Sequence, residues 1–298
     1  MTQDQKIRQL VFNYLAELSA QYGDVLPWKR LSQGVQYDGE RVPLLGPQGI
    51  FKPRLMEYPL SIATSPNSPY DDGFATNGLL LYKYRGENPD HPDNVGLRRA
   101  MELKLPLAYM HGIAKGKYVV SWPVYIVSDQ PQNLSVTVAV DDRSAIRFGN
   151  SAGVAEDASA RRRYITTQTK VRLHQKAFRE KVLSAYRQQC ALCNLKHTAL
   201  LDAAHIIPDS MEAGRPVVNN GLSLCKIHHA AYDQNILGIR PDHVVEIRTD
   251  ILKEVDGPML RYGLQEMHDS KIVVPRKPED RPSKDGLEER YELFRSAS

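Results

Sequence analysis

The sequence predicts an α+β protein of two domains, a β-rich domain over residues 1–155 and a second domain over residues 156–298. Short apolar runs separated by Gly and Pro dominate residues 27–148, a texture typical of strands and irregular loops. A composition break rich in Gly, Ala and acids follows at residues 149–160 and indicates the domain boundary. Beyond it, cysteines and histidines gather within residues 190–233.

The first domain begins with an amphipathic segment at residues 6–22. Its apolar side chains recur at i, i+3 and i+4, which predicts a helix that packs on the domain behind it. Strands are expected at residues 79–82, 118–120 and 134–140. In the last of these, Leu and Val alternate with Ser, Thr and Ala at the period of two that a strand requires.

The second domain is expected to begin with a helix over residues 170–189, which leads into the cysteine-rich segment. A strand that runs into a loop follows at residues 200–208, and a helix at residues 225–234. A short strand is predicted at residues 244–247 and a terminal helix at residues 287–294.

The composition is that of a globular protein. The 298 residues carry a formal net charge of +4, with 42% hydrophobic and 25% charged residues. No window approaches the roughly 20 apolar residues of a membrane span, and the first residues are polar, without a secretory apolar core. All three cysteines lie within residues 190–225, which leaves none for a disulfide. We therefore expect a cytoplasmic protein without a membrane partner.

The cysteines and one histidine have the spacing of a closed tetrahedral zinc site. A CxxC pair, a loop of about thirty residues and a CxxH pair supply the four ligands. These ligands are Cys190, Cys193, Cys225 and His228. The pattern favours a structural Zn²⁺, and it is compatible with a binding module that has no catalytic activity.

Further polar residues on the same segment have no evident structural role, and these are His205, Asn220, His229 and Asp233. His229 and Asp233 are four residues apart and therefore share one face of the expected helix. His228 is turned about 100° away from His229 by the helix period. The two adjacent histidines can therefore bind different metals.

This constellation resembles the HNH (ββα-metal) endonuclease family, over about residues 170–250. The resemblance implies hydrolysis of a phosphodiester bond. It implies that His205 is the general base and that Asn220 orients this base or its loop. It also implies that His229 and Asp233 bind a catalytic Mg²⁺ or Mn²⁺, for which carboxylate oxygen is a suitable ligand.

One position departs from the family. Many members carry His or Asp immediately before the general base as a metal ligand, and here that residue is Ala204. Asp202 lies two residues earlier on the same strand face and can bind the metal directly or through water. The alternative is a metal held by His229 and Asp233 with waters and phosphate.

The first domain resembles the SET-and-RING-associated (SRA) domains of the PUA-like superfamily. The resemblance is carried by Pro69-Tyr70-Asp71-Asp72-Gly73, Tyr84-Arg85-Gly86, Asp93-Asn94 with Leu97, and Tyr118-Val119-Val120. It implies that a modified cytosine flips out of DNA and stacks between Tyr70 and Tyr84. Asp72, or Asp71, then accepts a hydrogen bond from its exocyclic amine. The sequence has one acid fewer before Asp72 than the family pattern, and no Gly-rich run after Gly86.

A basic stretch joins the two domains. Eight Lys and Arg residues stand against one acid within residues 161–181, and they can neutralise DNA phosphates. The candidates for backbone contacts are Arg161, Arg162, Arg163 and Arg172. The alternative is a solvated basic helix face.

Together these resemblances imply a modification-dependent restriction endonuclease that cuts double-stranded DNA. One HNH site cuts one strand, so a double-strand break implies two protomers or two binding events, and we expect a homodimer. One alternative is a restriction-like endonuclease that recognises unmodified sequence or a backbone mark. The other is a zinc-stabilised DNA-binding regulator that does not cut.

Overall fold

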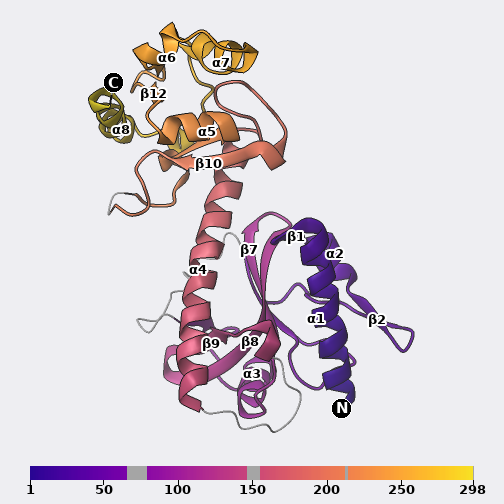
Figure 1. Cartoon of the computed structure of the whole chain (residues 1–298). Coiled ribbons are helices and arrows are strands. Elements are labelled where there is room, and N and C mark those ends of the chain that lie inside the picture. The colour runs from indigo at the N-terminus through magenta and orange to yellow at the C-terminus, as the bar shows by residue number, and fades with distance from the viewer. Residues whose placement is uncertain (66–78, 146–154, 212–213, 298) are drawn as a thin grey trace. The chain divides into compact units, whose positions relative to one another are not determined.

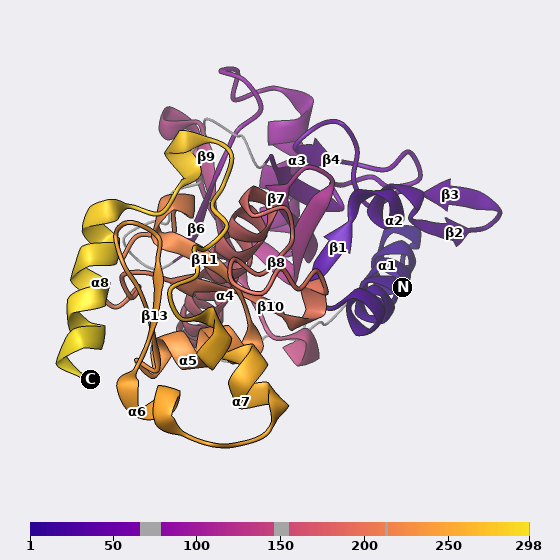
Figure 2. The same cartoon turned by 90° about the horizontal axis from the view of Figure 1, so that it is seen from above.

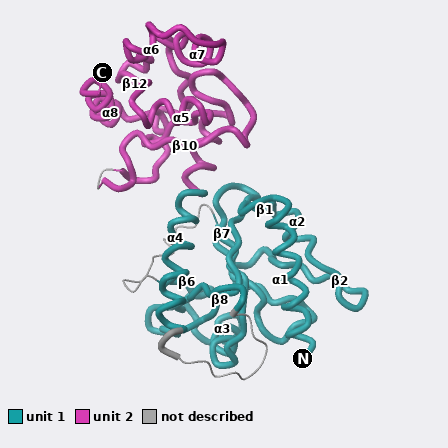
Figure 3. The backbone as a smooth tube through the Cα atoms, viewed as in Figure 1, with its two compact units in different colours: residues 1–176 teal, residues 177–298 magenta. Residues whose placement is uncertain are grey.

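The structure is a computed structural model that describes residues 1–65, 79–145, 155–211 and 214–297. The chain divides into two compact units, unit 1 over Met1–Lys176 and unit 2 over Ala177–Ser298 (Figure 3). Both units combine helices with strands, so the predicted α+β class is confirmed.

The division between the units falls inside the long helix α4 (Ala155–Ala185). This helix begins where the sequence placed the boundary between residues 155 and 156, fifteen residues before the predicted helix start at residue 170. Alanine and acidic residues open the segment, and both favour a helix N-terminus. No described helix is both long and apolar enough to cross a membrane.

A seven-stranded sheet forms the centre of unit 1, in the order β4-β5-β7-β8-β9-β6, with β1 paired on β8 (Figure 1). The β5–β7 pair is parallel and the other pairs are antiparallel. The strands are β1 (Val25–Pro27), β4 (Ile50–Phe51), β5 (Ser61–Thr64), β6 (Leu80–Lys83), β7 (Leu107–Ala114), β8 (Lys117–Gln130) and β9 (Ser135–Val140). The strands predicted near residues 79, 118 and 134 correspond to β6, β8 and β9.

Helix α1 (Gln3–Tyr22) covers part of this sheet. A capping box between Thr2 and Gln5 begins it, and its apolar side chains pack with Met110 of β7 and Trp122 of β8. Arg8 on the same helix is fully buried, and it pairs with Asp4 at 2.6 Å. The remaining elements of unit 1 are α2 (Trp28–Gln33), β2 (Val35–Tyr37), β3 (Glu40–Val42), α3 (Pro92–Glu102), η1 (Pro131–Asn133) and η2 (Arg143–Ala145).

Unit 2 is built around a ββα unit. Strand β10 (Leu201–His205) pairs antiparallel with β11 (Gly221–Cys225), and helix α5 (Lys226–Asp233) follows directly. The register pairs Leu201 with Cys225 and His205 with Gly221. The end of β11 that carries Cys225 therefore lies at the start of β10, and His205 lies at the opposite end of the hairpin.

The C-terminal part of the chain completes the core of unit 2. Helix α8 lies beside the β12–β13 hairpin (Figures 1 and 2), and the ring of Phe294 packs so closely on Gly238 that a Cβ there would lie 2.6 Å from it. Arg290 of α8 is buried and donates hydrogen bonds to the Tyr232 carbonyl and to Asn235. The further elements are η3 (Thr198–Leu200), η4 (Val218–Asn220), β12 (Leu237–Ile239), β13 (Val245–Ile247), α6 (Thr249–Lys253), α7 (Pro258–Gly263), η5 (Gln265–Met267), η6 (Pro278–Asp280) and α8 (Lys284–Ser296).

Candidate active site

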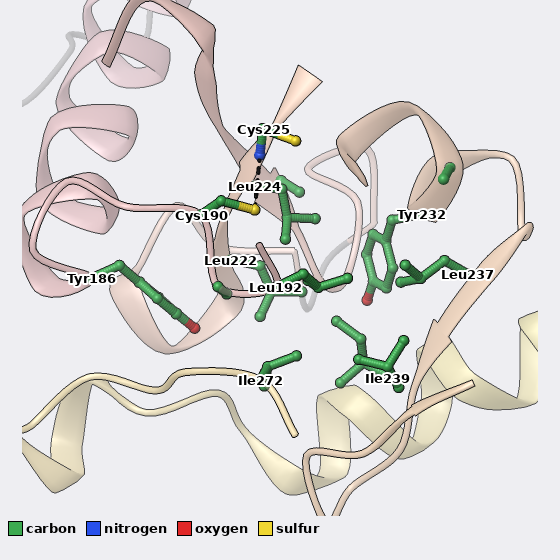
Figure 4. Close-up of a cluster of buried hydrophobic side chains, with 14 of the residues drawn as sticks. Tyr186, Cys190, Leu192, Leu222, Leu224, Cys225, Tyr232, Leu237, Ile239 and Ile272 are labelled. Carbon is green, nitrogen blue, oxygen red and sulfur yellow. Dashed lines mark hydrogen bonds between the residues drawn. The ribbon is translucent and has the colours of Figure 1, made fainter. Parts of the chain in front are cut away.

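The predicted zinc ligands come together in one cluster. The ligand atoms of Cys190, Cys193, Cys225 and His228 all lie within 4.8 Å of one another. Nδ1 of His228 lies 3.4 Å from Sγ of Cys190 and 3.2 Å from Sγ of Cys225. Figure 4 shows Cys190 and Cys225 beside the apolar side chains of the unit 2 core, among them Leu224 and Leu192. Three thiols and one imidazole at this spacing fit a tetrahedral metal such as Zn²⁺.

The surroundings of the cluster also suit a metal. Nε2 of His228 donates to the Gly263 carbonyl at 2.7 Å, so Nδ1, which faces the thiols, is the nitrogen placed to bind a metal. The backbone amide of Cys225 donates to Sγ of Cys190 at 3.3 Å, a contact that stabilises a thiolate (Figure 4). The end of α7 therefore helps to orient a ligand of the cluster, although Gly263 lies 35 residues beyond His228.

Strand β10 and helix α5 bring the second set of polar residues together. Asp202 on β10 faces His229 on α5, with 3.6 Å between Asp202 Oδ2 and His229 Nδ1. On the other side of the ring, His229 Nε2 lies 3.3 Å from Oδ2 of Asp233. His229 and Asp233 share a helix face, as the spacing of four residues predicts.

His205 closes the strand, and its ring is held by Phe178 of α4. The two rings are stacked, with their centroids 4.1 Å apart and their planes 13° apart. The pKa of His205 lies below its ordinary value, mainly because burial disfavours the charged ring. The charge of His229 also lowers this pKa, whereas the charges of Asp209 and Asp233 raise it. Its Nε2 is buried and has no hydrogen-bond partner among the described residues.

Asn220 fixes the loop that follows His205. Its side-chain oxygen accepts from the Ile207 amide at 2.9 Å, and its Nδ2 donates to the carbonyls of Ile207 at 3.0 Å and Arg215 at 3.1 Å. Its backbone carbonyl also accepts from the Ile206 amide at 3.0 Å. The asparagine is buried, so these contacts are shielded from water.

Two cationic side chains lie beside Asp202. Lys226 Nζ lies 2.8 Å from Asp202 Oδ2, and Arg179 Nε lies 3.9 Å from Asp202 Oδ1. Burial alone would raise the pKa of Asp202, but the hydrogen bond and charge of Lys226, together with His229, hold it below its usual range. Ala204 is fully buried in the core of unit 2.

Two of the four arginines predicted to contact DNA are engaged within unit 1. Arg161 Nε and Arg162 Nε bind the two carboxylate oxygens of Asp141 at 2.9 and 2.7 Å. Arg162 also lies over the ring of Tyr125, with its guanidinium carbon 4.5 Å from the ring centroid. Arg163 and Arg172 are exposed on α4.

The predicted base pocket is described only in part. Tyr70, Asp71 and Asp72 lie outside the described residues. Tyr84 is buried, and its hydroxyl donates to Asp129. Burial and this hydrogen bond raise the pKa of Tyr84 to about 12.

Tyr84 lines a cavity of about 360 Å³ in unit 1. Residues 45–50 form one wall of the cavity, and the ends of β5 and β6 form the other. Its lining combines aromatic and polar side chains, including Gln48, Thr64, Tyr82 and Lys83.

Three residues beside the ββα unit are not among the site residues that the sequence predicts. Phe178 belongs to the apolar stripe of its helix, a pattern that predicts burial but not stacking on His205. Arg179 is one cation of the basic stretch, and Lys226 is a residue between two metal ligands. The contacts of Arg179 and Lys226 with Asp202 join α4, β10 and α5, so no local sequence pattern could have revealed them.

Comparison with known proteins finds one family model and a similar solved structure. The model of the family described as HNH endonuclease matches residues 190–240, the segment that holds both the cysteine cluster and the ββα unit. A comparison with curated proteins finds no match. Among solved structures, one described as "Modification dependent TagI restriction endonuclease" is similar, with a TM-score of 0.29 and 17% identity over 80% of this chain and 81% of that chain. Residues 190–240 therefore form an HNH endonuclease domain, and the chain is a nuclease.

Proposed function

We propose that this chain is a DNA endonuclease in which His205 activates water for attack on a phosphodiester bond. The observation that supports the proposal most directly is the meeting of strand β10 and helix α5. That meeting sets Asp202 of β10 3.6 Å from His229 of α5, and His205 ends the same strand.

His205 has the properties of a general base. Burial keeps its imidazole neutral at physiological pH, and a neutral ring accepts a proton. The nitrogen that takes a proton from water must be accessible to water, and Nε2 is buried, so we assign the proton to Nδ1. An O–H bond of water breaks, the proton passes to Nδ1, and the hydroxide attacks phosphorus as the bond to the leaving oxygen breaks. The stacking on Phe178 holds the ring of the base in place, and the hydrogen bonds between Asn220 and Ile207, here called the Asn220 clamp, hold its loop.

His229 and Asp233 are the residues that would hold a divalent cation. Their ligand atoms are 3.3 Å apart, a separation that lets both contact one ion. Oxygen and imidazole ligands suit Mg²⁺ or Mn²⁺, as predicted from the sequence. Bound there, the ion supplies Lewis-acid stabilisation of the charge that develops on the phosphate. The Cys190, Cys193, Cys225 and His228 cluster has a different role, which is to hold the hairpin and α5 together through a structural Zn²⁺.

We also propose that unit 1 recognises a modified cytosine in double-stranded DNA. The cavity of about 360 Å³ supports this proposal, because its volume falls within the roughly 300–1,000 Å³ typical of ligand pockets. Its aromatic and polar lining suits a flipped base, which needs stacking and hydrogen bonds to its edge. Tyr84 lines the cavity, and Tyr70, Asp71 and Asp72 are the further residues that we propose for the base.

One panel of substrates tests both parts of the function. The same duplex is prepared unmodified, methylated, hydroxymethylated and glucosylated at cytosine, and each form is incubated with the full chain and Mg²⁺ or Mn²⁺. We expect cleavage that is strongest on one modified form. Equal cleavage of all four duplexes would remove the base-reading role and keep the nuclease. No cleavage with either ion would contradict the catalytic assignment.

A further inference from the structure

Two carboxylates face opposite nitrogens of the His229 ring. Asp202 Oδ2 lies 3.6 Å from Nδ1, and Asp233 Oδ2 lies 3.3 Å from Nε2. The lone pairs of the two nitrogens point away from each other across the ring. An ion bound at Nε2 therefore lies on the side of Asp233, whereas an ion bound at Nδ1 lies on the side of Asp202.

The charges around the two carboxylates differ, and they decide which side suits a cation. Asp202 Oδ2, the oxygen that faces His229, already receives the Lys226 ammonium at 2.8 Å, and the Arg179 guanidinium lies 3.9 Å from its other oxygen. A divalent cation placed there would be repelled by both groups. Asp233 is 57% exposed, and it pairs with His229. The Nε2 side is therefore the one open to a metal.

We propose that Asp202 is a positioning residue that acts through His229. Its carboxylate faces Nδ1 of His229 at 3.6 Å and favours the tautomer that carries the proton there, which leaves the lone pair of Nε2 on the side of Asp233, where a metal would bind. A carboxylate behind a metal-binding histidine is a recurring arrangement that orients the ring and makes it a stronger ligand. The inference rests on the proposed catalytic site, and it assigns to Asp202 a role other than direct metal binding.

The fold holds Asp202 rigidly enough for this role. Arg179 donates from Nη2 to the carbonyls of Thr198 at 2.7 Å and Leu201 at 2.8 Å, so its guanidinium is fixed against the start of β10. Lys226 opens helix α5 and reaches back to the same carboxylate. Asp202 of β10 therefore contacts residues of both α4 and α5, beside the side chain of His229.

The protonation of His229 in the metal-bound protein distinguishes the two roles. The full chain is labelled with ¹⁵N-histidine and titrated with Mg²⁺, and long-range ¹H–¹⁵N spectra identify which ring nitrogen of His229 carries the proton. A His229→Ala variant assigns the signals. We expect a proton on Nδ1 and a shift of Nε2 on addition of Mg²⁺. A proton on Nε2, or a ring that does not respond to Mg²⁺, would overturn the proposal.

A matched pair of variants gives a second readout, independent of DNA cleavage. Asp202→Asn keeps the shape of the side chain but removes its charge, and Asp242→Asn removes a carboxylate that pairs with Arg240 in the same unit. Loss of a supporting carboxylate typically weakens metal affinity about 10–100-fold. We expect that loss of Mg²⁺ affinity for Asp202→Asn alone, with one Mg²⁺ still bound per chain. Unchanged affinity would refute the positioning role while leaving the nuclease assignment intact, since that assignment depends on His205.

Discussion

The loop that carries the proposed base depends on one buried side chain, Asn220. We expect the substitution Asn220→Ala to destabilise unit 2 and to slow DNA cleavage without affecting unit 1. The neighbouring Asn219 provides the matched control, because its side chain is exposed and its backbone carbonyl accepts from the Ser283 amide.

The magnitude follows from the contacts that are lost. Asn220 makes three side-chain hydrogen bonds, two with the backbone of Ile207 and one with the carbonyl of Arg215. At about 1 kcal/mol for each bond, the free energy of unfolding should fall by about 3 kcal/mol. Domains typically have about 5–15 kcal/mol in total, so the variant remains folded but with a smaller margin. Asn219→Ala should change the free energy of unfolding by less than about 0.5 kcal/mol.

Urea denaturation measures this difference. The two tryptophans, Trp28 and Trp122, both lie in unit 1, so their fluorescence reports that unit alone. Far-UV circular dichroism reports the whole chain, and the transition that fluorescence does not follow belongs to unit 2. If Asn220→Ala unfolds at the same urea concentration as Asn219→Ala, the Asn220 clamp does not stabilise the loop.

Two further predictions concern protonation and the cysteine cluster. Burial lowers the pKa of His205 below its ordinary value of 6.5, so the neutral base persists to lower pH and the acid limb of the cleavage rate should have its midpoint below 6.5; a midpoint above 6.5 would contradict the assignment. The lowered pKa of His205 also affects stability. The folded state disfavours the charged ring, so the free energy of unfolding falls as pH drops below 6.5, the pKa of the ring in the unfolded chain. Removal of the metal from the cysteine cluster by a strong zinc chelator should unfold unit 2, since a structural Zn²⁺ typically contributes about 10–16 kcal/mol of binding free energy to the folded state. Full cleavage activity in protein shown to contain no zinc would disprove this role.

Local spacing was sufficient to predict which residues lie together in the cysteine cluster and on the face of α5. Cys190 and Cys193 lie on one turn, and Cys225 caps helix α5 three residues before His228. The Ala191 amide joins the two pairs, because it donates to the Ser223 carbonyl of β11 at 2.7 Å. The shared face of His229 and Asp233 likewise follows from the helix period alone. These predictions needed no knowledge of distant contacts.

Contacts between distant segments could not be predicted in this way. The run of arginines predicted a phosphate-binding surface, but the buried Asp141, twenty residues before Arg161, binds two of them. A charge pattern shows the sign of a surface and not the partner that folds against it. The same holds for Asp202: the period of two placed it near the metal ligands, and only the positions of Lys226 and Arg179 show how its carboxylate is engaged.

The central claim is that His205 takes a proton from water beside the site where His229 and Asp233 would hold a cation. Single-turnover cleavage of a preferred duplex by His205→Ala, with its circular dichroism and DNA affinity matched to the parent chain, tests it most directly. We predict a rate about 10²–10⁴-fold lower, the usual contribution of a general base. A His205→Ala variant that cuts DNA at the parent rate would contradict the claim.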